Sequence, residues 1–425
     1  MRVAKRLLAF LMLTALWIVI VGYGAISGWW LTPIALKDDA QAFVNAAIAI
    51  ADKQAKGNVA LVLIRNGVVF HQHYAPSLAS ADRHSVNRDT VFSAASMSKW
   101  VTAYGVMQLV QQGKLDLDAP ISRYLKRWQL PASEFDTSGV TVRRLLSHTA
   151  GLTDSLGFGD YAPNETIPSL EASLREPRAS SGNAVIAVGL APGSSWQYSG
   201  GGYLILQLIV EEVSGMRFAE WMRQAVFIPI DMQRASYDYI GDLQNASKSY
   251  DAAGKLAISY KYASAAATGL TVSAADLFKF VQVQLHAVNP AQLNSENVRA
   301  MRQPHGRKFG ADIWGLGVML YAPTAQRDYV FGHDGANDPA INTAVRINPD
   351  NGDAIIVLVT GNAKLATSLA YEWTLWQTGT PDFLTLEPAV KSAIKPVLAG
   401  LVIIVAIFVF PWQKLRAKLA RSRGN

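Results

Sequence analysis

Residues 59–75 read VALVLIRNGVVFHQHYA. Two apolar runs flank the pair Asn66-Gly67, which is typical of the type I′ turn because both residues readily adopt positive φ angles. The stretch therefore predicts a β-hairpin close to the beginning of a domain.

Beyond this hairpin the pattern changes to helix and later returns to strand. A helical pattern runs from Met97 to Gln112 and stops at Gly113, and residues 114–255 are rich in helix and loop signals. Strand patterns then return, followed by one more helix, in the order Gly315–Tyr321, Tyr329–Gly332, Ile341–Ile347, Ala354–Thr360 and a helix at about Lys364–Trp376. This order predicts an α+β domain whose two ends build one sheet around a helical insertion at about 114–255.

The composition excludes several classes of protein. A chain of 425 residues fits one or two domains, and 50% hydrophobic with only 17% charged residues excludes a disordered chain. The sequence contains no cysteine, which excludes disulfide frameworks, zinc ribbons and thiol catalysis.

The net charge of +7 is concentrated at the two ends of the chain. Residues 1–36 carry three basic residues and residues 411–425 carry five, with no acidic residue in either segment. Because these eight positive charges exceed the net charge by one, residues 37–410 are left with a net charge of −1. A body this close to neutrality lacks the basic surface that a nucleic acid requires, so we expect no nucleic-acid partner.

Each basic cluster flanks an apolar run. Leu7–Leu31 contains about 25 residues without a charge and ends near Trp29 and Trp30, and Pro396–Trp412 is a shorter run followed by the five basic residues. We expect an N-terminal anchor in residues 1–36 and a C-terminal transmembrane helix with a basic tail in residues 391–425. A cleaved signal peptide is the alternative for the first run, and a buried core helix for the second.

The positive-inside rule predicts the topology of such a chain. Both basic ends lie in the cytoplasm, so residues from about 37 to 393 lie on the opposite face, which is the periplasm in a bacterium. We therefore expect a protein of the bacterial inner membrane whose body, residues 37–390, is exported and whose two ends contact the lipid bilayer.

The body contains one candidate for nucleophilic catalysis, Ser96-Met97-Ser98-Lys99. Residues i and i+3 share one face of a helix, so the lysine lies beside the serine hydroxyl. A serine needs such a neighbouring base, and a helix N-terminus stabilises the developing negative charge. The same spacing recurs at Ser392–Lys395 beside the C-terminal apolar run, so the motif alone is not specific.

Three further motifs follow Ser96 in order: LLSHTAGL at 145–152, PGSSWQYSGGGY at 192–203 and FGHDGAN at 331–337. Together they resemble the class C β-lactamase-like serine hydrolases, which include penicillin-recognising enzymes, D-aminopeptidases and carboxylesterases. The resemblance covers roughly residues 40–375. It implies the β-lactamase/DD-peptidase-like fold, a five-stranded antiparallel sheet flanked by helices with a helical subdomain, and an active site between sheet and subdomain.

The resemblance also implies roles for individual residues. Ser96 corresponds to the acylated nucleophile, Lys99 to its proton partner, and Tyr198 to the tyrosine that protonates the leaving group and activates the deacylating water. The backbone N–H groups of Ser96 and Ala336 correspond to the oxyanion hole. His333 takes the place of the lysine in the family's Lys-Thr-Gly strand.

Two positions depart from the family pattern. Gly200 stands where the family often has an asparagine that binds the amide carbonyl of the substrate. His333 replaces a fixed cation in the sequence His333-Asp334-Gly335, and Asp334 adds a negative charge beside it. With Gly200, these three residues are the expected substrate-binding positions. The loss of the fixed cation predicts weak binding of a substrate carboxylate, and both departures predict poor hydrolysis of β-lactams.

We therefore expect a membrane-anchored periplasmic serine hydrolase that acts, through an acyl-enzyme, on esters or on peptides that are non-ribosomal or contain D-residues. The alternatives are a penicillin-binding sensor that is acylated without efficient turnover, a genuine β-lactamase, and a catalytically inactive domain. We expect a small-molecule or peptide substrate and neither a cofactor nor a metal. His148 is interpreted as structural, and Asp154–Leu190 is expected to shape the substrate pocket.

Overall fold

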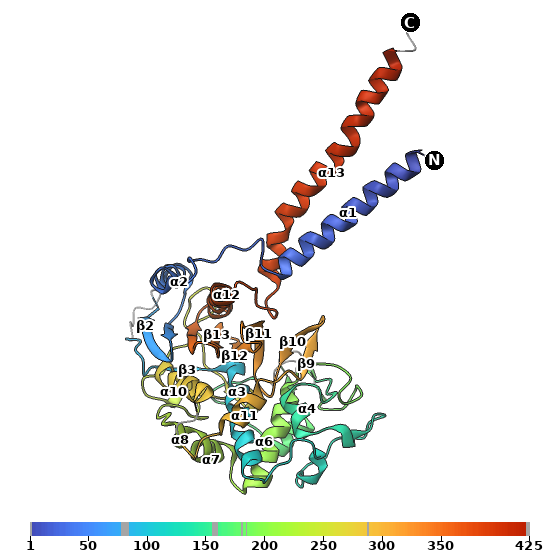
Figure 1. Cartoon of the computed structure of the whole chain (residues 1–425). Helices are drawn as coiled ribbons and strands as arrows, with labels where there is room; N and C mark the ends of the chain where they lie inside the picture. The colour runs from blue at the N-terminus through green and yellow to red at the C-terminus, as the bar shows by residue number, and fades with distance from the viewer. Residues whose placement is uncertain are drawn as a thin grey trace.

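The hairpin predicted at residues 59–75 forms one side of a large antiparallel sheet (Figure 1). Strand β1 (Val59–Arg65) pairs with β2 (Val68–Ala75), and Asn66 and Gly67 between them have φ angles of 50° and 75°. The computed structural model describes residues 2–77, 85–154, 160–179, 182–183, 185–286 and 289–421.

The sheet combines this hairpin with six strands from the other end of the domain. Its order is β2-β1-β14-β13-β12-β11-β10-β9, where the later strands are β9 (Gly306–Lys308), β10 (Ala311–Trp314), β11 (Met319–Pro323), β12 (Tyr329–Asn337), β13 (Ile341–Asn348) and β14 (Asp353–Thr360). The part of the chain that is described thus holds eight strands here rather than the five expected, and two of the additional strands are the hairpin β9–β10, which extends the edge at β11.

The central strands are buried on both faces, and alternation along each strand divides its side chains between two cores. In β1, Ala60, Val62 and Ile64 belong to one hydrophobic cluster, while Val59, Leu61 and Leu63 belong to the other. A strand covered on both faces reads as a continuous apolar run, as β1 and β14 do. The sheet is therefore the middle of three layers.

Helices cover the two faces. On one face lie α2 (Ala40–Gln54) and α12 (Leu365–Thr378), and on the other lie α3 (Ser98–Gln111) and α10 (Ala274–Leu285) (Figure 1). The sequence interpretation missed α2 and α10. The remaining helices of the α3 side are α4 (Val142–Leu146), α5 (Leu170–Arg175), α6 (Gly200–Ser214), α7 (Phe218–Met222), α8 (Ile228–Ile230), α9 (Ala265–Thr268) and α11 (Ser295–Met301).

Short strand pairs connect these helices. They are β3 (Val91–Ser93) with β8 (Thr271–Ser273), β4 (Asp160–Tyr161) with β7 (Lys261–Tyr262), and β5 (Arg178–Ala179) with β6 (Gly182–Asn183). The helical part extends to Met301, beyond the predicted limit near residue 255. The strand expected from Gly315 begins only at Met319, because Gly317, with φ 74°, lies in the turn between β10 and β11.

Two long terminal helices leave the body side by side (Figure 1). Helix α1 (Arg2–Ile26) and helix α13 (Glu387–Arg421) each contain a 23-residue segment, Ala4–Ile26 and Glu387–Val409, that is long and apolar enough to cross a membrane. At 1.5 Å per residue such a segment spans roughly 35 Å, which exceeds the bilayer core. The two helices pack together, and Trp17 Nε1 donates to the Pro396 carbonyl at 3.1 Å. Arg423, from the C-terminal basic cluster, lies outside the described residues.

A buried ion cluster ties the sheet to the segment that precedes α13. Arg346 on β13 is fully buried, pairs with Asp334 on β12, and contacts Asp382 at 3.1 Å. Its guanidinium also lies 3.3 Å from the ring centroid of Tyr321. The arginine therefore neutralises two carboxylates that the fold removes from water.

We predict that Arg346→Met lowers the free energy of unfolding by about 3–5 kcal/mol, because it leaves buried carboxylates without their cation. Thermal unfolding followed by tryptophan fluorescence measures this loss. Arg223→Met is the matched control, because Arg223 forms an exposed ion pair with Glu220, and exposed pairs contribute about 0–1 kcal/mol. Equal stability losses for the two variants contradict the prediction.

Candidate active site

Ser96 lies in a tight turn between β3 and α3. The turn is a 3₁₀ element at Ala95–Met97, and Ala95 has a φ of 48°, a strained conformation for a residue with a Cβ. Ser98 fixes the turn, because its hydroxyl donates to Ala95 O at 2.6 Å and accepts from Leu270 N at 2.9 Å. The side chain of Ser96 is left partly exposed, as a nucleophile requires.

Lys99 lies beneath Ser96 with its side chain almost fully buried. Its Nζ is 3.2 Å from Ser96 Oγ and donates to the carbonyl oxygen of Ala267 at 2.9 Å. The carbonyl only accepts, so it holds one N–H of the amine and leaves the Ser96 side of Nζ available for proton exchange. The predicted pair of nucleophile and base is thus brought together.

Tyr198 joins this pair from the loop before α6. The Lys99 Nζ lies 4.9 Å from the ring centroid of Tyr198 and 5.7 Å from that of Tyr203. Aromatic faces attract a cation, so both rings stabilise the position of the lysine. Tyr198, which lies about a hundred residues after Ser96 and Lys99 in the sequence, therefore joins them in one cluster.

Strand β12 brings the third motif against the turn of Ser96. A Cβ at Gly335 would overlap with the carbonyl oxygen of Ala94 and with Thr343 Oγ1, so only glycine permits this approach. Thr343 reinforces the contact by donating to Ala94 O at 2.9 Å. The next residue, Ala336, is exposed. The two elements that carry the expected oxyanion-hole N–H groups are therefore packed directly on each other.

His333 is fully buried on the same strand. Its Nδ1 lies 2.6 Å from the carbonyl oxygen of Asp334, so Nδ1 carries the proton and Nε2 is an acceptor that has no hydrogen-bond partner among the described residues. Burial, followed by the charge of Lys99, lowers the pKa of His333 from 6.5 to about 3. The imidazole is therefore neutral near pH 7 and offers a lone pair rather than a positive charge.

Asp334, by contrast, is not part of this cluster. Consecutive residues of a strand point to opposite faces, so His333 faces Lys99 while Asp334 faces Arg346 and the α12 layer. The expectation that its charge opposes a substrate carboxylate does not match this placement, because the Asp334 carboxylate is paired across the sheet.

Gly200 is the first residue of α6, directly after the N-cap Ser199. The buried Asp154, which the sequence interpretation did not single out, accepts from Ser199 Oγ at 2.5 Å and from Gly201 N at 2.9 Å. It therefore holds the beginning of α6, where a negative charge also complements the helix dipole. Of the segment that starts at Asp154, residues 155–159, 180–181 and 184 lie outside the described residues.

His148 was interpreted as structural, and its contacts place it directly behind Tyr198. Its Nδ1 accepts from Ser199 N at 3.1 Å, and its ring lies 4.4 Å from the Tyr198 ring, centroid to centroid. Trp314 packs against its edge at 4.7 Å. Burial holds the pKa of His148 well below 6.5, so this imidazole is also neutral. The order of the motifs indicated that His148 is near the site, but only the fold shows its contact with Tyr198.

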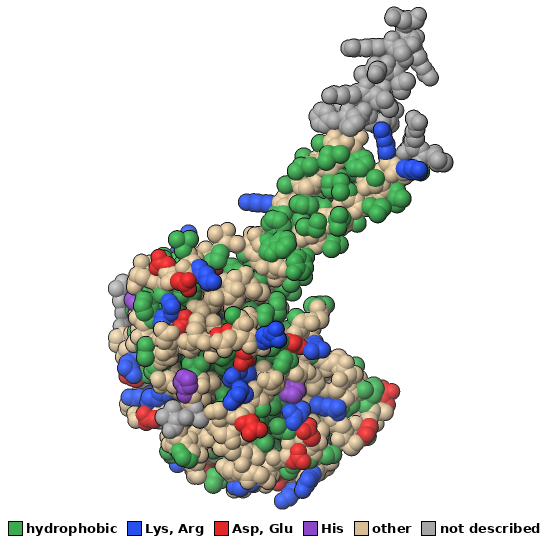
Figure 2. Space-filling model, viewed as in Figure 1, with side chains coloured by type: hydrophobic (Ala, Val, Ile, Leu, Met, Phe, Trp, Pro, Cys, Tyr) green, Lys and Arg blue, Asp and Glu red, His purple; other side chains and the backbone are tan. Residues whose placement is uncertain are grey.

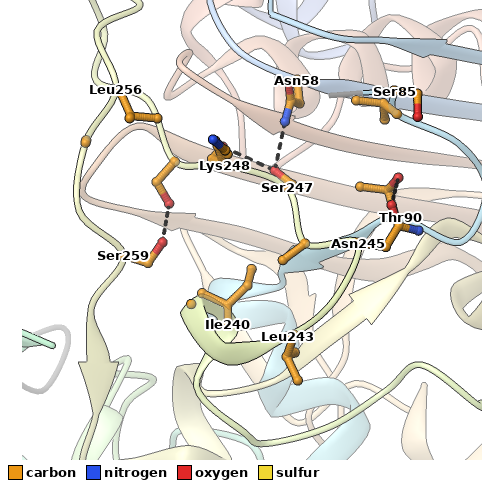
Figure 3. Close-up of a pocket in the computed structure, with 15 residues that line it drawn as sticks. Asn58, Ser85, Thr90, Ile240, Leu243, Asn245, Ser247, Lys248, Leu256 and Ser259 are labelled. Atoms are coloured by element: carbon orange, nitrogen blue, oxygen red, sulfur yellow. Dashed lines mark hydrogen bonds between the residues drawn. The ribbon is translucent and has the colours of Figure 1, made fainter. Parts of the chain in front are cut away.

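A separate cavity of about 500 Å³ lies away from this cluster (Figure 3). Its walls are part polar and part apolar, and some of the polar side chains are bonded to each other, for example Asn58 to Ser247 at 3.4 Å and Ser249 to Ser259 at 3.0 Å. Its lining includes none of Ser96, Lys99 and Tyr198. The cavity is therefore distinct from the cluster around Ser96.

Comparisons with known proteins agree with this geometry. The family model described as Beta-lactamase matches residues 43–375. A penicillin-binding protein of Bacillus subtilis (strain 168) is 28% identical over 182 residues, 41% of this chain and 37% of its own length. Esterase EstB of Burkholderia gladioli is 30% identical over 203 residues, 44% of this chain and 49% of its own length. The chain thus spans less than half the length of these two curated relatives.

A solved structure supports the fold independently. The octameric penicillin-binding protein homologue from Pyrococcus abyssi superposes with a TM-score of 0.65 at 20% identity, covering 79% of this chain and 76% of the other. At this identity the likeness concerns the fold alone.

We predict that His148→Leu lowers kcat for ester hydrolysis at least ~10-fold with little change in KM, because it removes the acceptor for Ser199 N–H and the ring support of Tyr198. His148→Asn, which can still accept from Ser199 N–H, should recover part of this loss. Burial keeps His148 neutral, so this residue should not titrate above pH 5. The pH–rate profiles of both variants above pH 5 should therefore have the same shape as the profile of the wild type. Equal losses for Leu and Asn contradict the positioning role.

Proposed function

Because the chain belongs to the beta-lactamase family, we propose that it is a serine hydrolase that forms an acyl-enzyme at Ser96. The observation that carries the proposal is the 3.2 Å contact between Ser96 Oγ and Lys99 Nζ, with the amine held from behind by the carbonyl of Ala267. In its uncharged form Lys99 accepts the hydroxyl proton while Oγ bonds to the carbonyl carbon of the substrate.

The rest of the cluster serves the same reaction. The backbone N–H groups of Ser96 and Ala336 stabilise the oxyanion of the tetrahedral intermediate. Its collapse breaks the bond to the leaving group, which takes up a proton through Tyr198. Water then attacks the acyl-enzyme with Tyr198 as the base, and the carbonyl–Oγ bond breaks to restore Ser96. The expected substrate is consequently a carboxylic acid derivative, either an ester or an amide.

Neutral substrates are favoured over carboxylates. His333, where the related enzymes carry a cation, is neutral because burial lowers its pKa to about 3. Gly200 offers no side-chain amide to a substrate. The Asp334 carboxylate does not face the substrate, because it is paired with Arg346 on the far face of the sheet. We therefore propose esters, or peptides that are non-ribosomal or contain D-residues, as substrates rather than β-lactams.

A penicillin-binding protein that is acylated without efficient turnover is the second candidate. The similarity to the Bacillus subtilis penicillin-binding protein favours it. It shares the acylation step and differs only in the rate at which water removes the acyl group, so turnover separates the two candidates.

We further propose that α1 and α13 anchor the body to the inner membrane of a bacterium, with the body in the periplasm. Both contain a segment long and apolar enough for a span, and Lys5 and Arg6 lie exposed near the beginning of α1. The exposed Trp29, which follows α1, suits the opposite membrane interface, where amphipathic aromatic rings are favoured.

We predict that Ser96→Ala lowers hydrolysis of p-nitrophenyl butyrate by at least ~10³-fold and abolishes labelling by a fluorophosphonate probe, because the nucleophile and its partners act as a unit. On the wild type, p-nitrophenyl butyrate and D-alanine p-nitroanilide should be turned over continuously, with nitrocefin a poor substrate.

Ser392→Ala is the matched control, because it alters the second Ser-x-x-Lys match at the beginning of α13 and should leave rate and labelling unchanged. An adduct mapped by mass spectrometry to another serine contradicts the assignment of Ser96. A single burst of product without further turnover favours the penicillin-binding candidate. A kcat/KM for nitrocefin of ~10⁶ M⁻¹s⁻¹ favours a β-lactamase.

We predict that both termini are cytoplasmic, because the flanking basic residues favour that face. A periplasm-dependent alkaline phosphatase fused after Asn425 should be inactive, whereas the same reporter inserted at Ala253, an exposed turn residue of the body, should be active. An active fusion after Asn425 contradicts the second span. A shortened mature N-terminus found by mass spectrometry shows that α1 is a cleaved signal peptide rather than an anchor.

A further inference from the structure

The turn between β9 and β10 presents an apolar side chain to solvent at the edge of the sheet. Phe309 at its tip is 91% exposed. Phe309 and Gly310 both have positive φ, at 52° and 83°, so the backbone itself directs the ring outward. The Phe309 ring therefore buries little apolar surface within the folded domain.

This tip lies on the side of the body from which the terminal helices leave (Figure 1). Between the tip and the base of the helices is a hollow of about 530 Å³, and the space-filling view shows the surface notched there (Figure 2). Its apolar walls are Ile26, Phe309, Pro323, Phe383, Leu384 and Leu386. Since Ile26 is the last residue of α1 and Leu386 directly precedes α13, the hollow begins where the two apolar segments end.

The charges around the hollow are arranged for a membrane surface. Asp312 is neutralised by Arg307 at 2.6 Å and accepts from the Tyr329 hydroxyl at 2.7 Å. The Lys308 ammonium lies 5.8 Å from the Phe309 ring centroid. An aromatic ring beside a cation on a long flexible stem is the combination that enters the boundary between headgroups and acyl chains.

We propose that the β9–β10 tip inserts into the outer leaflet and that the hollow binds one acyl chain of a bilayer phospholipid, with Lys308 at its phosphate. The proposal rests on the membrane anchoring proposed above. A lipid is favoured over a protein because Ile26, a residue of the spanning segment, forms part of the wall, so the hollow is continuous with the surface that faces the acyl chains.

The same hairpin also forms part of the active-site wall. Gly306 on β9 leaves room for the ring of Trp196, and the Lys308 ammonium lies 5.7 Å from that ring. Trp196 in turn lies 6.4 Å from the Tyr198 ring, centroid to centroid. A tip held in the bilayer therefore places one wall of the active site close to the headgroups, where amphiphilic substrates gather.

The chain contains no cysteine, so a single introduced cysteine can be labelled without ambiguity. The experiment attaches a nitroxide to Phe309→Cys in the full-length protein, reconstituted at one chain per nanodisc of phosphatidylcholine and phosphatidylglycerol. Ile228→Cys is the matched control, because Ile228 is an exposed apolar residue on α8, at the opposite end of the body from the terminal helices. Collisions with oxygen and with a water-soluble nickel chelate measure the depth of each label.

We expect the label at 309 to be at least ~3-fold more accessible to oxygen than to nickel, and the label at 228 to show the reverse. A diazirine-bearing phospholipid should crosslink to residues 308–312 or 383–386, and Phe309→Asp should reduce this yield at least ~3-fold. Ser96→Ala should retain the crosslink, which separates this proposal from the proposed catalysis.

Three outcomes overturn the proposal. A nickel-accessible label at 309 shows that the tip remains in water. A label that is shielded only at several chains per nanodisc assigns the hollow to a second copy of the chain. If carbonate extracts the wild type from membranes, the terminal helices do not span the bilayer, and the anchoring on which the proposal rests is absent.

Discussion

The contact between β12 and the turn before Ser96 is the constraint on which the site depends. At Gly335 the strand approaches the Ala94 carbonyl so closely that a side chain would not fit, and Thr343 on the next strand donates to the same carbonyl. The contact joins a sheet strand from the end of the domain to the nucleophile turn near its beginning. It also explains why Ala95 can retain a strained positive φ, since packing on both sides overdetermines its conformation.

The lysine at the centre of the site has an unusual set of neighbours. The described residues around Lys99 provide hydroxyl, carbonyl, imidazole and aromatic groups, and the carboxylate that follows His333 points to the other face of the sheet. Both nearby imidazoles, His148 and His333, are kept neutral by burial and by the charge of Lys99. Among these described neighbours, neutral polar groups surround Lys99 and do not compete with Ser96 for its proton exchange.

Local patterns predicted much of the fold, and the family resemblance, confirmed by the match over residues 43–375, predicted the antiparallel sheet flanked by helices and the helical subdomain. The Asn66-Gly67 turn and the apolar runs of β1, β13 and β14 are strong signals because period and turn chemistry agree there. Helix α2 was missed although its buried residues Phe43, Val44, Ala47 and Ala51 recur at helical spacing. Asp334 was expected beside the substrate, whereas strand alternation places it on the face opposite to His333. Its partner Arg346 could not be inferred, since only tertiary packing brings the two together. The contacts of Asp154 and His148 with Ser199 are likewise non-local and leave no trace in sequence spacing.

The pairing of β1 with β14 has a further consequence, for the order of events during synthesis. Val59 on β1 lies opposite Val359 on β14, so 300 further residues must be synthesised before β14 can pair with β1. At a synthesis rate of ~5–20 residues per second the hairpin β1–β2 exposes an apolar edge for about 15–60 s. An unpaired apolar edge can pair with other chains in this interval, and the domain acquires its cooperative stability only once β14 has formed.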